Sequence, residues 1–248
     1  MDRKLLREYL VELTGTMIFV YLAAGLVCVN QMTTPESTGV PALSVHQPGL
    51  LGVAIGQGVF WMTLLAITMP ISGGCLNPAI AIALWVFNRL STNRLAWFLG
   101  AQMIGSILAC ILLRLTFSPE ILQSAKLGAP HLNPLVYQMS SDGPARSAIF
   151  AGTAIEFLLT FCLFLAIFSP RDAGSFWRSG AILVGCVLFA FPLTGAALNP
   201  ARWFGPVFLG LLDGGTGGLP WRDAIVYVIG PTQGAFAGAV FCFKMRQS

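Results

Sequence analysis

The sequence predicts an all-α membrane protein with six transmembrane helices and two re-entrant half-helices, arranged as an inverted 3+3 repeat. Three observations lead to this prediction. Apolar residues make up 56% of the 248 residues and charged residues only 10%, whereas a soluble domain carries about a quarter charged residues. Six apolar segments are long enough to cross a membrane, and one eight-residue motif occurs once in each half of the chain.

The six long segments are predicted to span the membrane, because a spanning helix needs about 20 mostly apolar residues. They are residues 9–30, 49–70, 95–116, 148–169, 179–196 and 223–243. Two apolar segments, 77–88 and 199–211, are too short to span and are typical of re-entrant segments. The basic N-terminus resembles a signal peptide, but its apolar run is long for one and contains Glu12. We therefore interpret it as a retained first helix.

The basic residues predict the orientation. Nine Lys and Arg residues flank the spans on the side of the two termini and four on the other side, with Arg202 counted apart. Because positive residues concentrate on the cytoplasmic side, we expect both termini to be cytoplasmic. The chain is then a multi-pass protein of the cell (plasma or inner) membrane, in contact with membrane lipid. Small basic clusters between apolar runs indicate topology, and we expect no nucleic-acid partner.

The cysteines and histidines indicate no cofactor and no metal site. Six scattered cysteines form no Cys-x-x-Cys pair, so neither a disulfide framework nor a zinc site is predicted. His46 and His131 are the only histidines, and both lie in predicted loops. Because no Ser/His/Asp set converges, we expect a protein that is not an enzyme, and an intramembrane enzyme is a minor alternative.

The repeated motif divides the chain into two halves. Ser72-Gly-Gly-Cys-Leu-Asn-Pro-Ala79, the first box, recurs as Thr194-Gly-Ala-Ala-Leu-Asn-Pro-Ala201, the second box. Each half holds three spans, and because three is odd the halves are inverted relative to one another. We predict one channel domain, 1–248, with a first repeat at 1–116 and a second at 148–248. Inverted repeats with broken helices place a shared site near the membrane midplane.

Each box has the chemistry of an abrupt helix start inside the membrane. Asn is a favoured N-cap and Pro suits the first helical position. An extended backbone before each Asn needs water or protein to satisfy it at this depth, and a water-filled pore supplies that. The predicted pore motifs are Asn77, Pro78, Ala79, Asn199, Pro200 and Ala201, and the predicted pore carbonyls are those of Gly73, Gly74, Cys75, Gly195, Ala196 and Ala197.

Three charged residues fall deep inside the apolar segments, away from their ends. Arg202 directly follows the second box, and a charge at membrane depth is costly and usually functional, so we expect it at the narrowest point of the pore. Glu12 and Glu156 occupy equivalent places in the two halves. We expect them to accept hydrogen bonds from the backbone of the boxes, with Gln102 in a similar role. A third Asn-Pro pair at Asn133 lacks the rest of the motif, and we expect no pore role for it.

These residues resemble the aquaporin, or major intrinsic protein, family, and the resemblance covers nearly the whole chain. It implies a homotetramer with one pore in each subunit. It also implies a selectivity filter of Gln57, Val187, Ala196 and Arg202. The last three resemble nodulin-like channels, which pass small neutral solutes and metalloid hydroxides and usually have Trp where Gln57 stands. Cys75, where the family usually has His, and Trp203 also depart from the pattern.

The sequence thus predicts a passive channel for water and small uncharged solutes, such as glycerol, urea or metalloid hydroxides, that excludes ions and protons. Two alternatives stay open. The first is a strictly water-selective channel. The second is a secondary transporter, because broken helices in inverted repeats also suit alternating access; its coupling would depend on Glu12 and Glu156.

Overall fold

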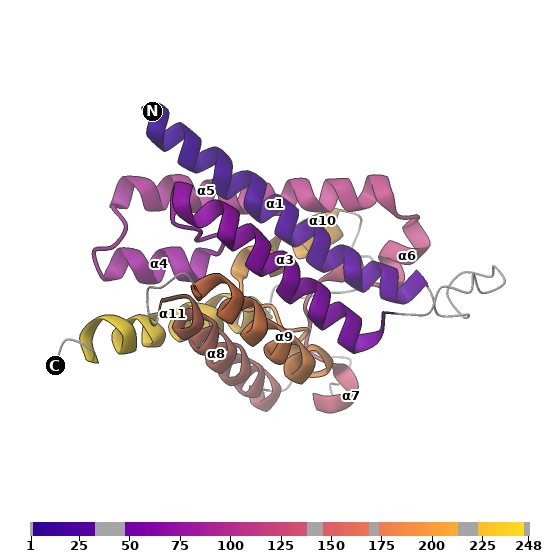
Figure 1. Ribbon diagram of the computed structural model, residues 1–248. Helices are drawn as coiled ribbons and strands as arrows, with labels where there is room; N and C mark the ends of the chain where they lie inside the picture. The colour runs from indigo at the N-terminus through magenta and orange to yellow at the C-terminus, as the bar shows by residue number, and fades with distance from the viewer. Residues whose placement is uncertain (1, 33–47, 138–145, 169–173, 213–222, 246–248) are drawn as a thin grey trace.

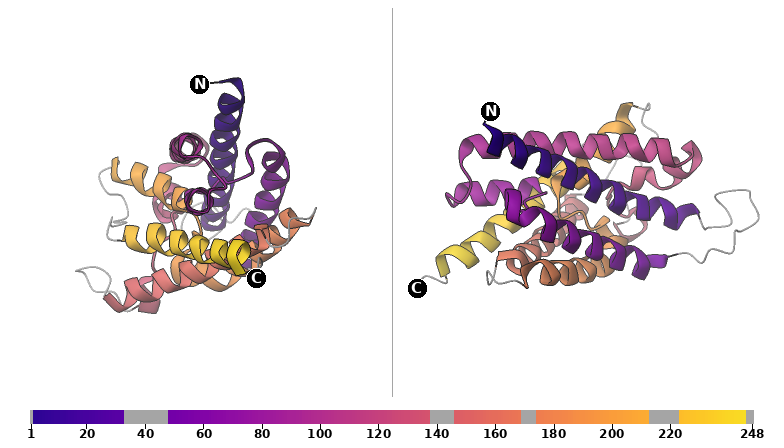
Figure 2. Two further views of the ribbon diagram at one scale, coloured as in Figure 1. Left: turned by 90° about the vertical axis from the view of Figure 1, so that its left-hand side faces the viewer. Right: turned by 45° about the horizontal axis from the view of Figure 1, so that its top comes forward.

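The computed structural model describes residues 2–32, 48–137, 146–168, 174–212 and 223–245. Within these ranges the chain is a helical bundle with six helices long and apolar enough to cross a membrane (Figure 1). The spans are α1 (Arg3–Met32), α3 (Gly49–Ser72), α5 (Thr92–Thr116), α8 (Arg146–Phe168), α9 (Ser175–Thr194) and Ile225–Lys244. Both termini lie at one end of the bundle, here called the termini face, which the left panel of Figure 2 views directly. The predicted fold class is confirmed.

Two short helices complete the predicted pattern. They are α4 (Pro78–Val86) and α10 (Pro200–Leu212), and each begins at the proline of a box. The half-helix α4 packs against α5 of its own repeat and α11 of the other, while α10 packs against α5 of the first repeat and, through fewer contacts, against residues 225–229 of its own. Each half-helix is therefore held between spans from both halves.

The element ends differ from the prediction in two informative places. Asp2 caps α1, because its Oδ1 accepts a hydrogen bond from Leu5 N at 2.7 Å. This helix therefore begins six residues earlier than the apolar run, and Glu8 lies inside it. The last span consists of η3 (Ile225–Ile229), α11 (Gly230–Val240) and η4 (Phe241–Met245), and η3 and η4 are π-helical turns. Pro231 follows η3, and its missing N–H breaks the regular hydrogen-bond ladder there.

Glycines let the spans approach closely at matching places in the two halves. A side chain at Gly105 of α5 would collide with the Leu13 carbonyl of α1, and one at Gly234 of α11 with the Phe157 carbonyl of α8. Small residues at helix contacts are expected in a membrane, where association depends on close packing of the helices. The neighbouring α1 and α5, which lie side by side in Figures 1 and 2, and the pair α8 and α11 thus form equivalent contacts.

The segment between α5 and α8 folds onto the bundle at the end opposite the termini. It contains α6 (Pro119–Ser124), η1 (Lys126–Gly128) and α7 (Pro134–Tyr137). Its composition predicts a polar loop, but Leu127 and Leu132 are buried. Asn133 donates from N to Leu193 O at 3.0 Å and from Nδ2 to Pro192 O at 2.9 Å. These bonds fix the segment to the end of α9, immediately before the second box.

The carboxylate of Asp223, just before the last span, is buried with few interactions that stabilise its charge. The side chain of Asp223 is 3% exposed, and its Oδ1 has no hydrogen-bond partner among the described residues. Burial raises the pKa of Asp223 from 3.8 to about 6, although the positive charge of Lys126 opposes the shift. The folded state therefore holds this proton more tightly than the unfolded chain, whose Asp has a pKa near ~3.9. Stability falls as the pH rises from about 4 to 6.

We expect Asp223→Asn to stabilise the folded protein at pH 7.5 by roughly 1–2 kcal/mol, after a discount for screening near the surface. The gain should shrink toward zero below about pH 3, where Asp223 is protonated in both states. Thermal unfolding of the detergent-solubilised protein across this pH range measures the difference. Glu120→Gln, which alters an exposed carboxylate of α6, is the matched control. A gain that does not depend on pH would contradict the account.

Candidate functional site

The asparagine of each box caps a half-helix. Asn77 is extended, with φ −155° and ψ 115°, and its Oδ1 accepts a hydrogen bond from Ala79 N at 2.9 Å. Asn199 accepts from Ala201 N at the same distance. With Pro78 and Pro200 at the first helical positions, both helices begin as the N-cap chemistry predicts.

The two boxes are joined by a reciprocal pair of hydrogen bonds. Asn77 Nδ2 donates to the carbonyl oxygen of Leu198 at 2.9 Å, and Asn199 Nδ2 donates to that of Leu76 at 2.8 Å. Each bond uses one of the two N–H groups of a side-chain amide. The start of each half-helix is therefore tied to the box of the other half, and both positive helix ends face the same region.

The backbone before each Asn differs from the expected extended chain. Three residues of each box have a positive φ: Gly73 (95°), Gly74 (63°) and Leu76 (45°) in the first, and Gly195 (80°), Ala196 (48°) and Leu198 (52°) in the second. The pattern is the same in the two boxes. Non-glycine residues are uncommon in the left-handed region, and such strain persists only where the surroundings fix it.

Two buried carboxylates fix these strained segments. Glu12 of α1 accepts hydrogen bonds from Ser72 Oγ at 2.6 Å and from the backbone N–H groups of Cys75 and Leu76 at 3.1 and 2.7 Å.

Glu156 of α8 makes the same set in the second half. It accepts from Thr194 Oγ1 at 2.6 Å and from the N–H groups of Ala197 and Leu198 at 3.1 and 2.8 Å. Both carboxylates are fully buried. The backbone N–H groups of the boxes are thereby satisfied away from water, as a helix-breaking segment at membrane depth requires.

Several supporting contacts differ between the halves. Gln102 Nε2 donates to Glu12 at 2.8 Å, whereas the corresponding sequence position in the second half is Pro231, which has no side-chain donor. Ser106 Oγ donates to the Ala201 carbonyl, and the sequence reasoning did not identify this residue. The same reasoning overlooked the hydroxyl groups of Ser72 and Thr194, although a hydroxyl residue at the start of both boxes was a usable signal.

The four residues expected in the filter come from three helices and one box. Gln57 lies on α3, Val187 on α9, Ala196 in the second box and Arg202 on α10, and each is at most 3% exposed. Gln57 Nε2 and the Nε and Nη1 atoms of Arg202 have no hydrogen-bond partner among the described residues. Buried polar groups almost always have partners, so these atoms indicate a place for water or a polar ligand.

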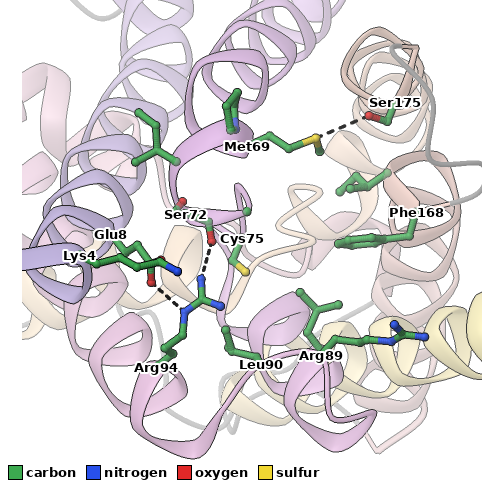
Figure 3. Close-up of a pocket in the computed structure, with 15 residues that line it drawn as sticks. Lys4, Glu8, Met69, Ser72, Cys75, Arg89, Leu90, Arg94, Phe168 and Ser175 are labelled. Atoms are coloured by element: carbon green, nitrogen blue, oxygen red, sulfur yellow. Dashed lines mark hydrogen bonds and ion pairs between the residues drawn. The ribbon is translucent and has the colours of Figure 1, made fainter.

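The two residues that depart from the family pattern have different surroundings. Trp203 is buried and stacks on Tyr227 of η3, with ring centroids 5.7 Å apart and an interplanar angle of 19°. Cys75 lines a cavity of about 610 Å³ at the termini face (Figure 3). Ser72 and Gly73 also line this cavity, so it leads to the first box.

Charged residues surround the same cavity. Arg94, from the start of α5, forms an ion pair with Glu8 of α1, with Nε and Oε2 2.7 Å apart. Its Nη2 donates to the carbonyl oxygen of Ser72 at 3.1 Å. Figure 3 shows Arg94 between Glu8 and Ser72, with the sulfur atom of Cys75 nearby. The sequence reasoning treated Arg94 only as an orientation signal.

Comparison with known proteins agrees with this geometry. The family model described as "Major intrinsic protein" matches residues 1–242. Aquaporin TIP4-4 of Zea mays is 30% identical over 246 residues, which cover 97% of this chain and 87% of the relative. Putative aquaporin NIP4-1 of Arabidopsis thaliana is 29% identical over 237 residues, with 94% and 72% covered.

The fold is similar to that of a solved structure as well. The aquaglyceroporin from Plasmodium falciparum superposes with a TM-score of 0.74 at 21% identity, and the match covers 97% of each chain. A doubled Asn-Pro-Ala box, six spans with two half-helices, and a family match over nearly the full length lead to one assignment. The chain belongs to the major intrinsic protein family, the aquaporins.

Proposed function

We propose that this protein is a passive channel that admits water and small uncharged solutes and excludes ions and protons. The reciprocal bonds between Asn77 and Leu198 and between Asn199 and Leu76 carry the proposal. They bring two half-helix N-termini together from opposite halves. Membership of a family of channels supports the coarser statement, and the exclusion of protons follows from the local chemistry below.

The path runs past both asparagines. Each amide keeps one N–H group beyond its bond to the other box, and a water molecule that accepts it turns its own hydrogens away. The positive ends of α4 and α10 repel cations from this point. The carbonyls of Gly73, Gly74, Cys75, Gly195 and Ala197 are the proposed acceptors along the remainder of the path. A water chain whose central molecule turns both hydrogens outward cannot pass a proton through that point in either direction.

The filter admits solutes larger than water. Val187 and Ala196 are small and apolar, while Gln57 and Arg202 contribute polar atoms that no described protein group engages. A solute with several hydroxyl groups loses hydration when it enters a narrow pore. Gln57 and Arg202 replace part of that hydration, and Val187 offers an apolar wall. Trp203 stacks on Tyr227, which supports a filter that Trp203 does not fill.

The contacts of the buried acids argue against the ion-coupled alternative. A secondary transporter would need acids that exchange protons or bind cations during each cycle. Glu12 and Glu156 are instead occupied by hydroxyl and backbone donors of the boxes. Releasing either carboxylate would leave buried N–H groups without partners, at a cost of about 1–3 kcal/mol for each group.

The same proposal covers assembly and location. We propose one channel domain over 1–248, formed by the repeats 1–116 and 148–248. In this proposal the subunits form a homotetramer in the cell membrane, with both termini in the cytoplasm. The apolar outer faces of the six spans would contact lipid or neighbouring subunits.

We expect purified protein in liposomes to conduct water without protons. Stopped-flow light scattering after a sucrose step should show faster shrinkage than empty liposomes, with a low activation energy. A pH gradient across the same vesicles, followed with an internal dye, should decay no faster than in empty vesicles. Proton flux that rises in step with water flux would contradict the proposal.

We expect Gln57→Trp to narrow the filter. Flux of glycerol, urea and undissociated arsenous acid should fall more than water flux, because a bulky ring replaces a flexible amide. Isotonic swelling assays on matched liposomes measure both quantities. Gln233→Trp, an exposed glutamine of α11, is the control and should leave both fluxes unchanged. A larger loss of water flux than of solute flux would show that Gln57 does not line the constriction.

A further inference from the structure

Arg94 holds a backbone carbonyl at the entrance to the first box. Ser72 is the last residue of α3, and the final carbonyls of a helix have no partner within it. Arg94 Nη2 donates to this oxygen at 3.1 Å. The guanidinium is itself fixed, because Glu8 binds Nε at 2.7 Å and the ring of Phe98 lies beneath Cζ at 5.2 Å from its centroid. Figure 3 shows Arg94, Glu8 and Ser72 beside the cavity.

The second half places a different donor on the equivalent carbonyl. Thr194 is the last residue of α9 and occupies the position of Ser72 in its box. Its carbonyl oxygen accepts a hydrogen bond from the hydroxyl of Tyr227 at 2.7 Å. A donor on this carbonyl is thus present in both halves, although the two donors have different chemistry.

The sequence correspondence between the two halves shows how the donors Arg94 and Tyr227 are related. After the boxes, Ala101-Gln-Met-Ile-Gly-Ser106 in the first half corresponds to Gly230-Pro-Thr-Gln-Gly-Ala235 in the second, which aligns Gln102 with Pro231. Counting back four residues then pairs Phe98 with Tyr227. Counting back eight pairs Arg94 with Asp223. In the first half, Arg94 lying over Phe98 therefore supplies the donor that the hydroxyl of Tyr227 supplies alone in the second half.

Hydrogen bonds connect this carbonyl to the asparagine of the other half. Ser72 Oγ donates to Glu12, and Glu12 also accepts from Leu76 N. The carbonyl of Leu76 in turn accepts from Asn199 Nδ2 at 2.8 Å. A displacement of Ser72 would be passed on to the place where the two boxes meet.

We infer that Arg94, oriented by Glu8, is a positioning residue that fixes the first box and thereby the amide of Asn199 in the conducting geometry. The inference rests on the proposed function, because it concerns flux through the same path. Arg94 does not belong to the filter, so its loss should slow water and solutes alike.

The test compares water flux per folded channel in liposomes. Arg94→Ala should lower the unit water permeability about fivefold, the factor expected when one hydrogen bond that orders the path is lost. Its activation energy should rise, and the ratio of urea to water flux should stay constant. Glu8→Gln should act in the same direction but more weakly. The double variant should match Arg94→Ala, since Glu8 acts through Arg94.

Three further variants test whether Arg94 acts by its position, by its charge or through folding. Arg89→Ala removes another cation that lines the cavity but lies over Phe243, and it should leave flux unchanged. Adding Phe98→Tyr to Arg94→Ala places a hydroxyl at the position that corresponds to Tyr227, and it should restore most of the flux. If Arg94→Ala does not fold, the single variants Arg94→Lys and Glu8→Gln provide the comparison. The shorter cation of Arg94→Lys cannot bind both Glu8 and Ser72.

The outcomes distinguish this inference from the proposed function. Wild-type liposomes no more permeable than empty ones would contradict the proposed function itself. Wild-type flux with an unaffected, folded Arg94→Ala would overturn only the present inference. It would also be overturned by an equal loss in Arg89→Ala, by additive effects of Glu8 and Arg94, or by no recovery with Phe98→Tyr. The inference is supported by a loss of flux in Arg94→Ala that Glu8→Gln does not increase and that Phe98→Tyr reverses.

Discussion

The structure depends on two buried carboxylates that accept hydrogen bonds from interrupted helices. A chain that breaks its helix at membrane depth leaves backbone N–H groups without partners, and hydrocarbon offers none. Glu12 and Glu156 supply those partners from inside the protein, each to one hydroxyl and two successive N–H groups. The left-handed residues, the caps at Asn77 and Asn199 and the bonds between the boxes all require this support.

The two halves solve the same problem with different residues. The carboxylates, the left-handed positions and the crossed asparagines match closely between the repeats. The surrounding contacts do not. Gln102 donates to Glu12, whereas the corresponding position in the second half is Pro231, and Arg94 donates to the Ser72 carbonyl, whereas Tyr227 donates to the Thr194 carbonyl. The termini face carries a charged entrance, while at the opposite end Asn133 ties the segment between α5 and α8 to the end of α9.

The sequence was sufficient to predict the fold and the equivalence of the two boxes, because long apolar runs and a doubled motif are signals that a single chain displays. It was not sufficient to predict the backbone of the boxes. An extended stretch and a series of left-handed turns place the same residues in the same order, and only the carboxylates that bind the N–H groups decide between them.

Contacts between residues far apart in the sequence could not be predicted from the sequence either. Glu8 and Arg94 lie 86 residues apart, and each looks like an ordinary charge at a helix end. The segment from α6 to α7 lacks a regular apolar period, so the burial of Leu127 and Leu132 depends on the surface beneath it. The family resemblance implied the filter positions, and the structure adds the observation that polar atoms of Gln57 and Arg202 are buried without partners among the described residues.

An experimental structure at a resolution that shows ordered water tests the central claim most directly. The account predicts a continuous file of water molecules that passes the filter and both asparagines and reaches the cavity at the termini face. Those waters should accept hydrogen bonds from Asn77 Nδ2, Asn199 Nδ2, Gln57 Nε2 and Arg202 Nη1. A dry path, with the second N–H group of each asparagine and the Gln57 and Arg202 donors bonded to protein groups instead, would contradict the account.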